Sequence, residues 1–512
     1  VWRAGRCWTP GRGPRPLRPM TAQLSSGHRA VDHAFRGALG DLHANLRPYR
    51  GGALSRSGIV LFAGMDYDGP GTRDIAINAW NGASLFMAAA VANGLLAQIR
   101  KEGGRWVPTE TQSWDAAIWA QGAWSHWCMT GDRALLTVAA EAVPDLIAWF
   151  EAREFDAERG LFRGPAGIHT GISAYADRWD VAGHSSIGSW AEMHPDERVA
   201  AGQGAPMWTL ATNLVHWRAY HLAADLSWAI GRPPDAGWAA KAERLLAAIE
   251  RTFWNEAKGT YGYLVDATTR SDRQDAMAHA CALLWGACPA ERAARLIASQ
   301  RIEPAGVPAL WPPFRRYAAC GAGAVPRHAG TIWPPVSALW GCAVAEHGHL
   351  DQLGRELVAL AERAQRDGHF AEVYHPISGE RYGGVQEEVS DAPLADGALR
   401  RRVGDTANGR TCYEWSSAIR QSWSASGYLR LVLQGMCGLR FASDRLRFAP
   451  ALPEGFTEVM VDRVPWRAAR LKLRLRGQGT RIASCRIDGV EAEPELPAST
   501  IGDRDVEITL DG

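Results

Sequence analysis

Long segments of this chain repeat apolar residues at the spacing of an α-helix, and many of them follow one another in pairs. They are rich in Ala, Leu and Ile, and short turns such as M-T-G-D and G-R-P-P join the partners of a pair. Apolar residues three and four positions apart predict helices rather than strands. The predicted helical segments are residues 74–101, 112–128, 132–150, 207–230, 235–253, 273–287, 290–299, 331–347, 350–366 and 420–434.

The lengths of the joining loops decide between an open stack of hairpins and a closed ring. A stack needs a repeat of fixed length, whereas these loops differ widely, which favours a ring. After Gly438 the pattern changes to short alternating runs such as ARLKLRLRG and DVEITLDG, which predict β-strands. We therefore predict an (α/α)6 barrel in residues 25–437 and a small C-terminal β-sandwich in residues 438–512.

The first 24 residues are expected to be irregular or weakly attached. The first twenty contain five Arg and no acidic residue. They lack the apolar centre of a secretory signal, and we leave residues 1–24 out of the predicted fold.

Charge and cysteine usage exclude several classes of protein. The 56 Lys and Arg balance 55 Asp and Glu, a net charge of +1, which argues against a nucleic-acid partner. No run of eighteen apolar residues predicts a membrane span. Nine Cys without a C-x-x-C pair predict buried free thiols, no metal site and a cytoplasmic location.

Tryptophan is unusually frequent and suggests the kind of ligand. The chain has 23 Trp but only 12 Phe and 11 Tyr. Because a buried indole N–H needs a partner, Trp is a costly core residue. Its excess favours a flat ligand such as the face of a sugar ring.

Acidic residues beside aromatic ones mark three loop regions where chemistry is expected. These are residues 71–81, 175–186 and 370–376, with S-W-S-A at 422–425 further along. Hydrolysis of a glycosidic bond needs one carboxylic acid to protonate the leaving oxygen and one carboxylate to direct water or attack. Asp180 follows Trp179, and Glu372 lies between apolar residues, which can tune both carboxyls. Taken singly, each acid also fits a solvated loop residue, and each Trp fits the core.

The order of these motifs resembles the inverting six-hairpin glycosidases. T-R-D, then W-D-x-x-G-x-S-S, E-x-Y and S-W-S-A are similar to motifs of the family 15 glucoamylases. H-A-G-T-I-W-P-P (328–335) and E-V-Y-H-P-I-S-G (372–379) resemble glycoside hydrolase family 63. The resemblance covers roughly residues 60–440.

The resemblance implies roles for individual residues. Glu372 would be the general base and Asp180 the general acid. In family 63 the acid stands in D-N-S-P-R-W-D, and alignment on R-W-D places Ala174 at that position. This departure leaves Asp177 as an alternative acid.

The remaining implied residues would hold the sugar. Arg73 and Asp74 would bind adjacent ring hydroxyls, four Trp would form walls, and the others would donate or accept hydrogen bonds. His169 and His184 are further candidates for hydrogen bonding. The expected substrate-binding residues are Arg73, Asp74, Trp80, Asp115, Asp177, Trp179, His328, Trp333, Tyr374 and Trp423.

We thus predict an inverting exo-acting glycoside hydrolase for an α-linked oligosaccharide or small glycoside, without an organic cofactor. No ligand string indicates a structural cation. The alternatives are an inverting glycoside phosphorylase and a non-catalytic glycan-binding relative. An epimerase would need paired histidines in the pocket, for which His169 and His328 are the candidates.

Overall fold

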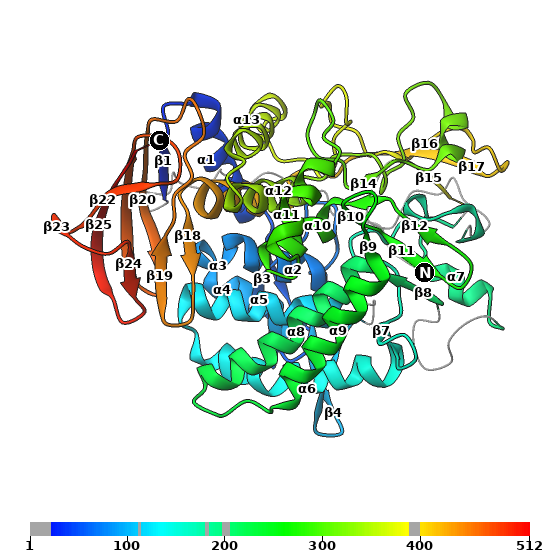
Figure 1. The fold of residues 1–512 in the computed structure, drawn as a ribbon, viewed down its shortest axis with the longest axis horizontal. Helices are drawn as coiled ribbons and strands as arrows, with labels where there is room; N and C mark the ends of the chain where they lie inside the picture. Colours follow the sequence, from blue (N-terminus) through cyan, green and yellow to red (C-terminus); the bar gives the residue numbers. More distant parts are fainter. Residues whose placement is uncertain (1–21, 111–113, 180–183, 197–204, 389–399, 512) are drawn as a thin grey trace, which may run out of the picture.

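The computed structural model describes residues 22–110, 114–179, 184–196, 205–388 and 400–511, and it is mainly helical (Figure 1). Most helices fall in the segments that the periodicity predicts, although many are a few residues shorter, whereas α1 (Arg29–Ala44) and α7 (Gly188–Met193) lie outside all the predicted segments. They are α1 (Arg29–Ala44), α2 (Thr72–Asn78), η1 (Ala79–Ala83), α3 (Ser84–Phe86), α4 (Ala88–Ala97), α5 (Asp115–Thr130), α6 (Arg133–Glu154), α7 (Gly188–Met193), α8 (Leu210–Ala229), α9 (Gly237–Phe253), α10 (Ala276–Leu284), α11 (Ala290–Ser299), α12 (Pro334–Glu346), α13 (Leu350–Asp367), α14 (Ser422–Arg430) and η5 (Leu431–Met436).

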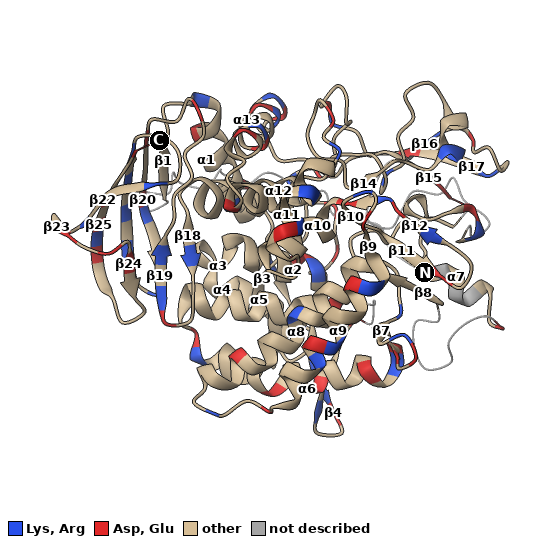
Figure 2. Cartoon of the chain, in the orientation of Figure 1, with Lys and Arg blue, Asp and Glu red and all other residues tan. Residues whose placement is uncertain are grey.

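Some of these helices are buried on all sides and others on one face only. In α5, α10, α12 and α14 nearly every residue is buried, whereas α1, α9, α11 and α13 bury a single stripe. A helix that is apolar all round belongs inside a larger body. Figure 2 shows the same division, since α4 and α5 carry almost no charge while α13 carries many.

The buried helices pack against one another in sequence order. α2 contacts α5, α5 contacts α8, α8 contacts α10, α10 contacts α12, α12 contacts α14, and α14 contacts α2. Around them, α1 packs against α13 and α14, α6 against α5 and α8, α9 against α8, and α13 against α12.

The C-terminal strands form two sheets at one end of the helical body (Figure 1, left). A six-stranded sheet has the order β1-β20-β21-β25-β22-β23, with β21 and β25 parallel, and a smaller sheet has the order β18-β19-β24. In β21, Ala469, Leu471, Leu473 and Leu475 are buried in alternation, as a strand with one face on a core requires. The bounds are β18 (Leu439–Phe441), β19 (Arg445–Phe448), β20 (Glu458–Trp466), β21 (Ala468–Arg476), β22 (Ile482–Ile487), β23 (Val490–Glu491), β24 (Glu495–Pro497) and β25 (Ile501–Leu510).

The first described strand belongs to this C-terminal sheet. β1 (Gln23–Ser25) pairs with β20, and Leu24 is buried. We expected residues up to 24 to be irregular, so residues 22–24 differ from that expectation. The reason is a long-range pairing, which local sequence pattern does not reveal.

Short strands that sequence analysis did not predict connect the helices. Several lie at the end opposite the C-terminal sheets (Figure 1, right), namely β8 (Met207–Thr209), β11 (Leu264–Asp266), β12 (Arg270–Ser271), β15 (Val385–Glu387), β16 (Arg400–Asp405) and β17 (Thr411–Trp415). β13 (Gln274–Asp275) pairs with β14 (Leu310–Trp311). The others are β2 (Leu46–Tyr49), β3 (Gly58–Leu61), β4 (Ile99–Glu102), β5 (Arg105–Pro108), β6 (Phe155–Asp156), β7 (Leu161–Phe162), β9 (Trp254–Asn255) and β10 (Thr260–Tyr261).

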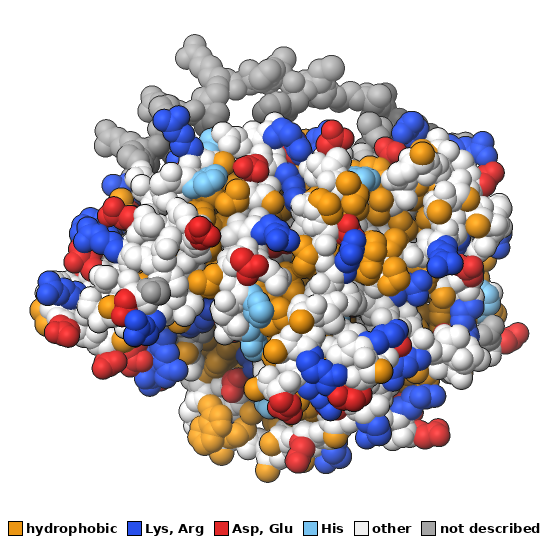
Figure 3. Space-filling model, turned by 45° about the horizontal axis from the view of Figure 1, so that its top comes forward, with side chains coloured by type: hydrophobic (Ala, Val, Ile, Leu, Met, Phe, Trp, Pro, Cys, Tyr) orange, Lys and Arg blue, Asp and Glu red, His pale blue; other side chains and the backbone are white. Residues whose placement is uncertain are grey.

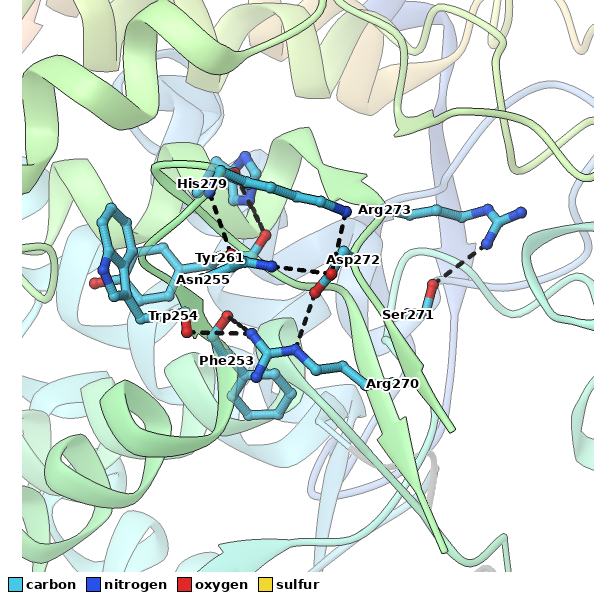
Figure 4. A network of polar contacts seen from close by, with 11 residues as sticks. Phe253, Trp254, Asn255, Tyr261, Arg270, Ser271, Asp272, Arg273 and His279 are labelled. Atoms are coloured by element: carbon cyan, nitrogen blue, oxygen red, sulfur yellow. Dashed lines mark hydrogen bonds and ion pairs between the residues drawn. The ribbon is translucent and has the colours of Figure 1, made fainter. Parts of the chain in front are cut away.

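Polar contacts fix the segment that leads into α10 (Figure 4). Asp272 accepts hydrogen bonds from Asn255 Nδ2 and Arg270 Nε, both at 2.9 Å. Arg270 also donates to the carbonyl of Phe253. The segment ends at Asp275, whose carboxylate caps α10 by accepting from the amide of Ala278.

The cysteines differ from the expectation in one respect. Cys320 and Cys412 form a disulfide across 92 residues of sequence, whereas we expected free thiols throughout. Chain folding brings the two segments together, and spacing alone does not indicate that. The other described cysteines are free and buried.

Within the described ranges, no helix is both long and apolar enough to cross a membrane. Basic and acidic side chains are intermixed on the face that Figure 3 shows.

Candidate active site

A cavity of about 260 Å³ brings together several of the predicted residues. α2, α12 and α14 begin at its edge, and loops and short strands complete it. Pro334 and Pro335 open α12, where a missing N–H costs little, and Trp333 directly precedes them. The lining residues are Tyr67, Arg73, Asp74, Ile168, Thr170, Gly171, Ser185, Ser186, Arg327, His328, Trp333, Glu372, Gln386, Trp415 and Trp423.

Two hydrogen-bond donors hold the Glu372 carboxylate, which is only 2% exposed. Tyr67 Oη donates to Oε1 at 2.8 Å, and Arg327 Nη2 donates to Oε2 at 2.5 Å. The Glu372 amide donates to the carbonyl of Ala418 at 2.9 Å, which fixes the backbone. Because each carboxylate oxygen has two lone pairs, both oxygens can still accept a proton from water.

Arg327 is itself tightly placed. Its Nη1 donates to the carbonyl of Gly383 at 2.7 Å, and its guanidinium lies over the rings of Trp333 and Trp415 at 5.4 and 5.5 Å from their centres. This geometry keeps a positive charge beside the Glu372 carboxylate and fixes its orientation.

Asp74 is a second acid in the cavity, in the first turn of α2. Burial raises the pKa of Asp74 to about 7, and the positive charge of Arg73 opposes this shift. The Arg73 guanidinium points elsewhere: its Nε lies 3.2 Å from Asp115 Oδ1, and its Nη1 donates to the carbonyl of Gly167. The Asp74 carboxyl can therefore carry a proton near neutral pH.

His328 lines the cavity in its neutral form. Burial lowers its pKa well below the ordinary value, and the charge of Arg327 adds to the effect. A side chain at Gly171 would place Cβ 2.2 Å from the His328 ring and from Gln386 Oε1, so only glycine fits at that position.

Tryptophan rings form part of the wall, as expected. Trp333 and Trp423 meet edge to face with their centres 5.8 Å apart. Trp333 Nε1 donates to the carbonyl of Arg327 at 3.0 Å, whereas Trp423 Nε1 is buried without a hydrogen-bond partner among the described residues.

Other predicted residues lie away from this cavity. Trp179 is buried against Trp190, and its Nε1 is 3.3 Å from Asp266. Tyr374 is buried, and its hydroxyl accepts from the amide of Ala371. Both are core residues here.

Three further candidates, Trp80, Asp115 and Asp177, also lie away from this cavity. Trp80 stacks on Trp285 and lines a different cavity. Asp115 is buried behind Arg73. The Asp177 side chain is 63% exposed and lies 3.1 Å from Arg316. Asp180 lies outside the described residues.

Sequence reasoning missed Tyr67, Arg327, Gln386 and Trp415. Arg327 directly precedes the H-A-G-T-I-W-P-P motif, so the motif could have indicated Arg327 as a site residue. Tyr67 carries no such indication, because it is far from Glu372 in sequence and reaches it only through the fold. In the described part of the chain, no cluster of three or more His, Cys, Asp or Glu could hold a metal ion.

Comparison with known families identifies the helical part. The profile of the mannosylglycerate hydrolase MGH1-like glycoside hydrolase domain matches residues 78–416. The chain belongs to this family. It therefore contains a glycoside hydrolase domain, and the resemblance to six-hairpin glycosidases is confirmed. The profile of the glycosyl hydrolase family 65 C-terminal domain matches residues 439–493.

Solved structures share this fold at low sequence identity. A protein described as a sialidase is 13% identical with a TM-score of 0.63, over 94% of this chain and 41% of the other. A GH78 family rhamnosidase of a Bacillus species is 13% identical with a TM-score of 0.56, over 96% and 44%. This chain thus spans less than half of either protein.

A shorter protein matches along its whole length. The GH63 mannosylglycerate hydrolase from Thermus thermophilus, solved with glucose, is 14% identical with a TM-score of 0.54, over 78% of this chain and 100% of the other. A search of curated protein sequences found no match.

Proposed function

We propose that this glycoside hydrolase removes a terminal sugar from an α-linked oligosaccharide or small glycoside with inversion of configuration. Glu372 acts as the general base. The observation that carries the proposal is a carboxylate set in a cavity with aromatic walls and held by Tyr67 and Arg327.

Several features support an exo-acting mode. The cavity of about 260 Å³ is smaller than the roughly 300–1,000 Å³ common for larger ligands, so it suits one sugar ring. The Trp333 and Trp423 faces suit the apolar face of that ring. Asp74 and His328 can form hydrogen bonds with the hydroxyls of this ring, and Arg73 lines the cavity next to Asp74.

We propose Asp180 as the general acid, on the motif that places it after Trp179. Inversion needs its carboxyl roughly 6.5–9.5 Å from that of Glu372, with room for water between them. Asp74 is a second candidate, because burial raises its pKa to about 7 and it lines the same cavity as Glu372. A carboxyl with that pKa is protonated in neutral or weakly acidic solution and can supply the proton.

We propose an (α/α)6 barrel as the frame of this site. The contacts that run in turn from α2 through α5, α8, α10, α12 and α14 and back to α2 support it. In such a ring the starts of α2, α12 and α14 meet at one mouth, which is where the cavity lies.

Nitrophenyl α-glycosides and α-linked disaccharides provide the test, with NMR detection of the anomer first released. We expect the inverted anomer. A product of retained configuration would disprove the inverting mechanism, and turnover that depends on phosphate would identify a phosphorylase.

Variants separate the two candidate acids. Glu372→Gln should lower kcat about 10²–10⁴-fold, the range of a lost acid or base. If Asp180 is the acid, Asp180→Asn should lower kcat to a similar extent on a substrate with a poor leaving group. The loss of kcat should be much smaller on nitrophenyl glycosides, because their leaving group needs little protonation. If Asp74 is the acid, Asp74→Asn should show this pattern instead.

A further inference from the structure

A second cavity, of about 210 Å³, lies at the opposite ends of the helices that begin at the candidate active site. Trp333 directly precedes α12 in the first cavity, while Glu346 ends that helix in the second. At about 1.5 Å per residue, the two ends of α12 lie about 20 Å apart. α14 likewise runs from Trp423 in the first cavity to Arg430 in the second.

Arg430 is the most deeply buried charge in this second cavity, at 4% exposed. Its Nη1 donates to the carbonyl of Trp80 at 3.3 Å, and its guanidinium lies 4.4 Å from the centre of the Trp80 ring. Its Nε is buried without a hydrogen-bond partner, and no carboxylate pairs with Arg430 among the residues that the structure describes.

Arg218, from the middle of α8, is the second positive group. Its Nε donates to Gln121 Oε1 at 3.0 Å, and Gln121 Nε2 donates in turn to Ser125 Oγ at 2.9 Å. Across the described segments, no carboxylate forms an ion pair with Arg218. Neutral groups therefore make the described hydrogen bonds of this guanidinium, and the nearest acid that acts on its charge, Asp225, lies beyond ion-pair distance.

The remaining charges leave the cavity positive. Arg440 pairs with Glu346 at 3.2 Å, so these two cancel. Burial raises the pKa of the Cys128 thiol to about 12, so it stays neutral. Arg218 and Arg430 then have no carboxylate within ion-pair distance among the described residues, although Asp225 acts on Arg218 and Glu346 on Arg430 from farther away. Burial lowers the pKa of each. Carbonyl groups at the surrounding helix ends offset only part of this charge, and a buried unpaired charge is costly.

A further donor without a partner points to a ligand. Trp285 lines this cavity and stacks on Trp80, with ring centres 5.4 Å apart. Its Nε1 is buried and makes no hydrogen bond to any described residue. The cavity thus holds two unused N–H groups, on Arg430 and Trp285, and an excess of positive charge.

We propose that this second cavity binds a small oxyanion, a carboxylate or a phosphate, between Arg218 and Arg430. Guanidinium groups suit the planar or tetrahedral oxygens of such anions, and the cavity volume excludes large ligands. The site is separate from the glycosidic one and does not rest on the proposed reaction. A bound anion would link α8 to α14 at the end of the helical body next to β18.

Direct binding measurements on the full chain test the proposal. Calorimetric titrations and thermal unfolding would use inorganic phosphate and, separately, malonate in a buffer of constant ionic strength. We expect binding of at least one anion and a rise in Tm. Binding of phosphate alone or malonate alone would identify which oxyanion the site takes.

Variants locate the binding. Arg430→Gln and Arg218→Gln should each weaken it about 10- to 100-fold, the range for a lost charged hydrogen bond. Trp285→Phe keeps an aromatic ring but removes the N–H, so it should also weaken anion binding. It provides the test if an Arg variant fails to fold. Arg153→Gln is a matched control, because Arg153 also lies over a ring, that of Trp149, and donates to a backbone carbonyl, but lies outside the cavity.

Two results would overturn the proposal. One is the absence of binding by both anions at millimolar concentration. The other is equal binding by the wild type, Arg430→Gln, Arg218→Gln and Trp285→Phe, which would place the anion elsewhere. Because binding is measured directly, a failure of the glycosidase proposal would not affect either outcome.

Discussion

At the scale of single residues, the two donors on Glu372 decide how well it can direct water. Tyr67 and Arg327 come from segments far apart in sequence, and each occupies one carboxylate oxygen. Their joint effect is to fix the orientation of the carboxylate.

Arg327→Lys should therefore impair catalysis while leaving the fold intact. Lysine keeps the charge but loses the planar contact with Gly383 and the two Trp rings. We expect kcat to fall about 10- to 100-fold while KM changes little. Steady-state kinetics would measure both constants, with Arg153→Lys as the control. An unchanged kcat would contradict a role for Arg327 in positioning Glu372.

Asp115 should make stability depend on pH. Burial raises the pKa of Asp115 to about 7, against 3.8 for the ordinary side chain. Between these values the folded state holds more protons than the unfolded state, so the free energy of unfolding falls as pH rises. The shift corresponds to as much as about 4 kcal/mol.

Asp115→Asn should remove this contribution. Urea unfolding at several pH values should show a flatter decline between about pH 4 and 7 than in the wild type. Asp177→Asn, which changes an exposed carboxylate, is the control. An equal decline in Asp115→Asn and the wild type would show that burial does not control this group.

At the scale of elements, side-chain caps fix the starts of α6 and α10. α6 starts after Asp132, whose carboxylate accepts from the amides of Ala134 and Leu135. His126 Nε2 lies 3.5 Å from the other oxygen of this carboxylate and, together with these amides, lowers the pKa of Asp132.

Asp132→Ala should lower the free energy of unfolding by about 1 kcal/mol, because two amides at the helix start lose their acceptor. Asp132→Asn keeps a capping oxygen and should cost less. Chemical denaturation of both variants would measure the difference. Equal losses would show that the charge interaction with His126, rather than the cap, stabilises this helix start.

At the scale of the whole molecule, a covalent link joins distant segments. The Cys320–Cys412 disulfide ties η4 (Arg315–Cys320) to β17, which carries Trp415 of the active-site cavity. It encloses a long loop, and such links stabilise mainly by restricting the unfolded chain.

Reduction of this disulfide, or the Cys320→Ser/Cys412→Ser double variant, should therefore lower stability by about 2–4 kcal/mol. Thermal unfolding with and without reductant would measure the change. Cys485→Ser, which alters a free cysteine, is the control. A wild-type Tm that does not respond to reductant would mean that the bridge contributes nothing to stability.

Periodicity and motifs determined the helical body, the C-terminal strands, the family and Glu372. These features are local: apolar spacing depends on the helix or strand alone, and E-V-Y-H-P-I-S-G is one continuous string. The helix bounds shifted by a few residues, because capping and packing set them.

Only the tertiary structure decided which residues share a cavity. The motifs around Trp179 and Trp333 predicted a substrate contact for both residues. In the structure, Trp179 packs in the core, whereas Trp333 lines the cavity. Tyr67 reaches Glu372 across 305 residues of sequence. The physical reason is that long-range packing, rather than neighbouring residues, determines where a side chain points and which charges it meets.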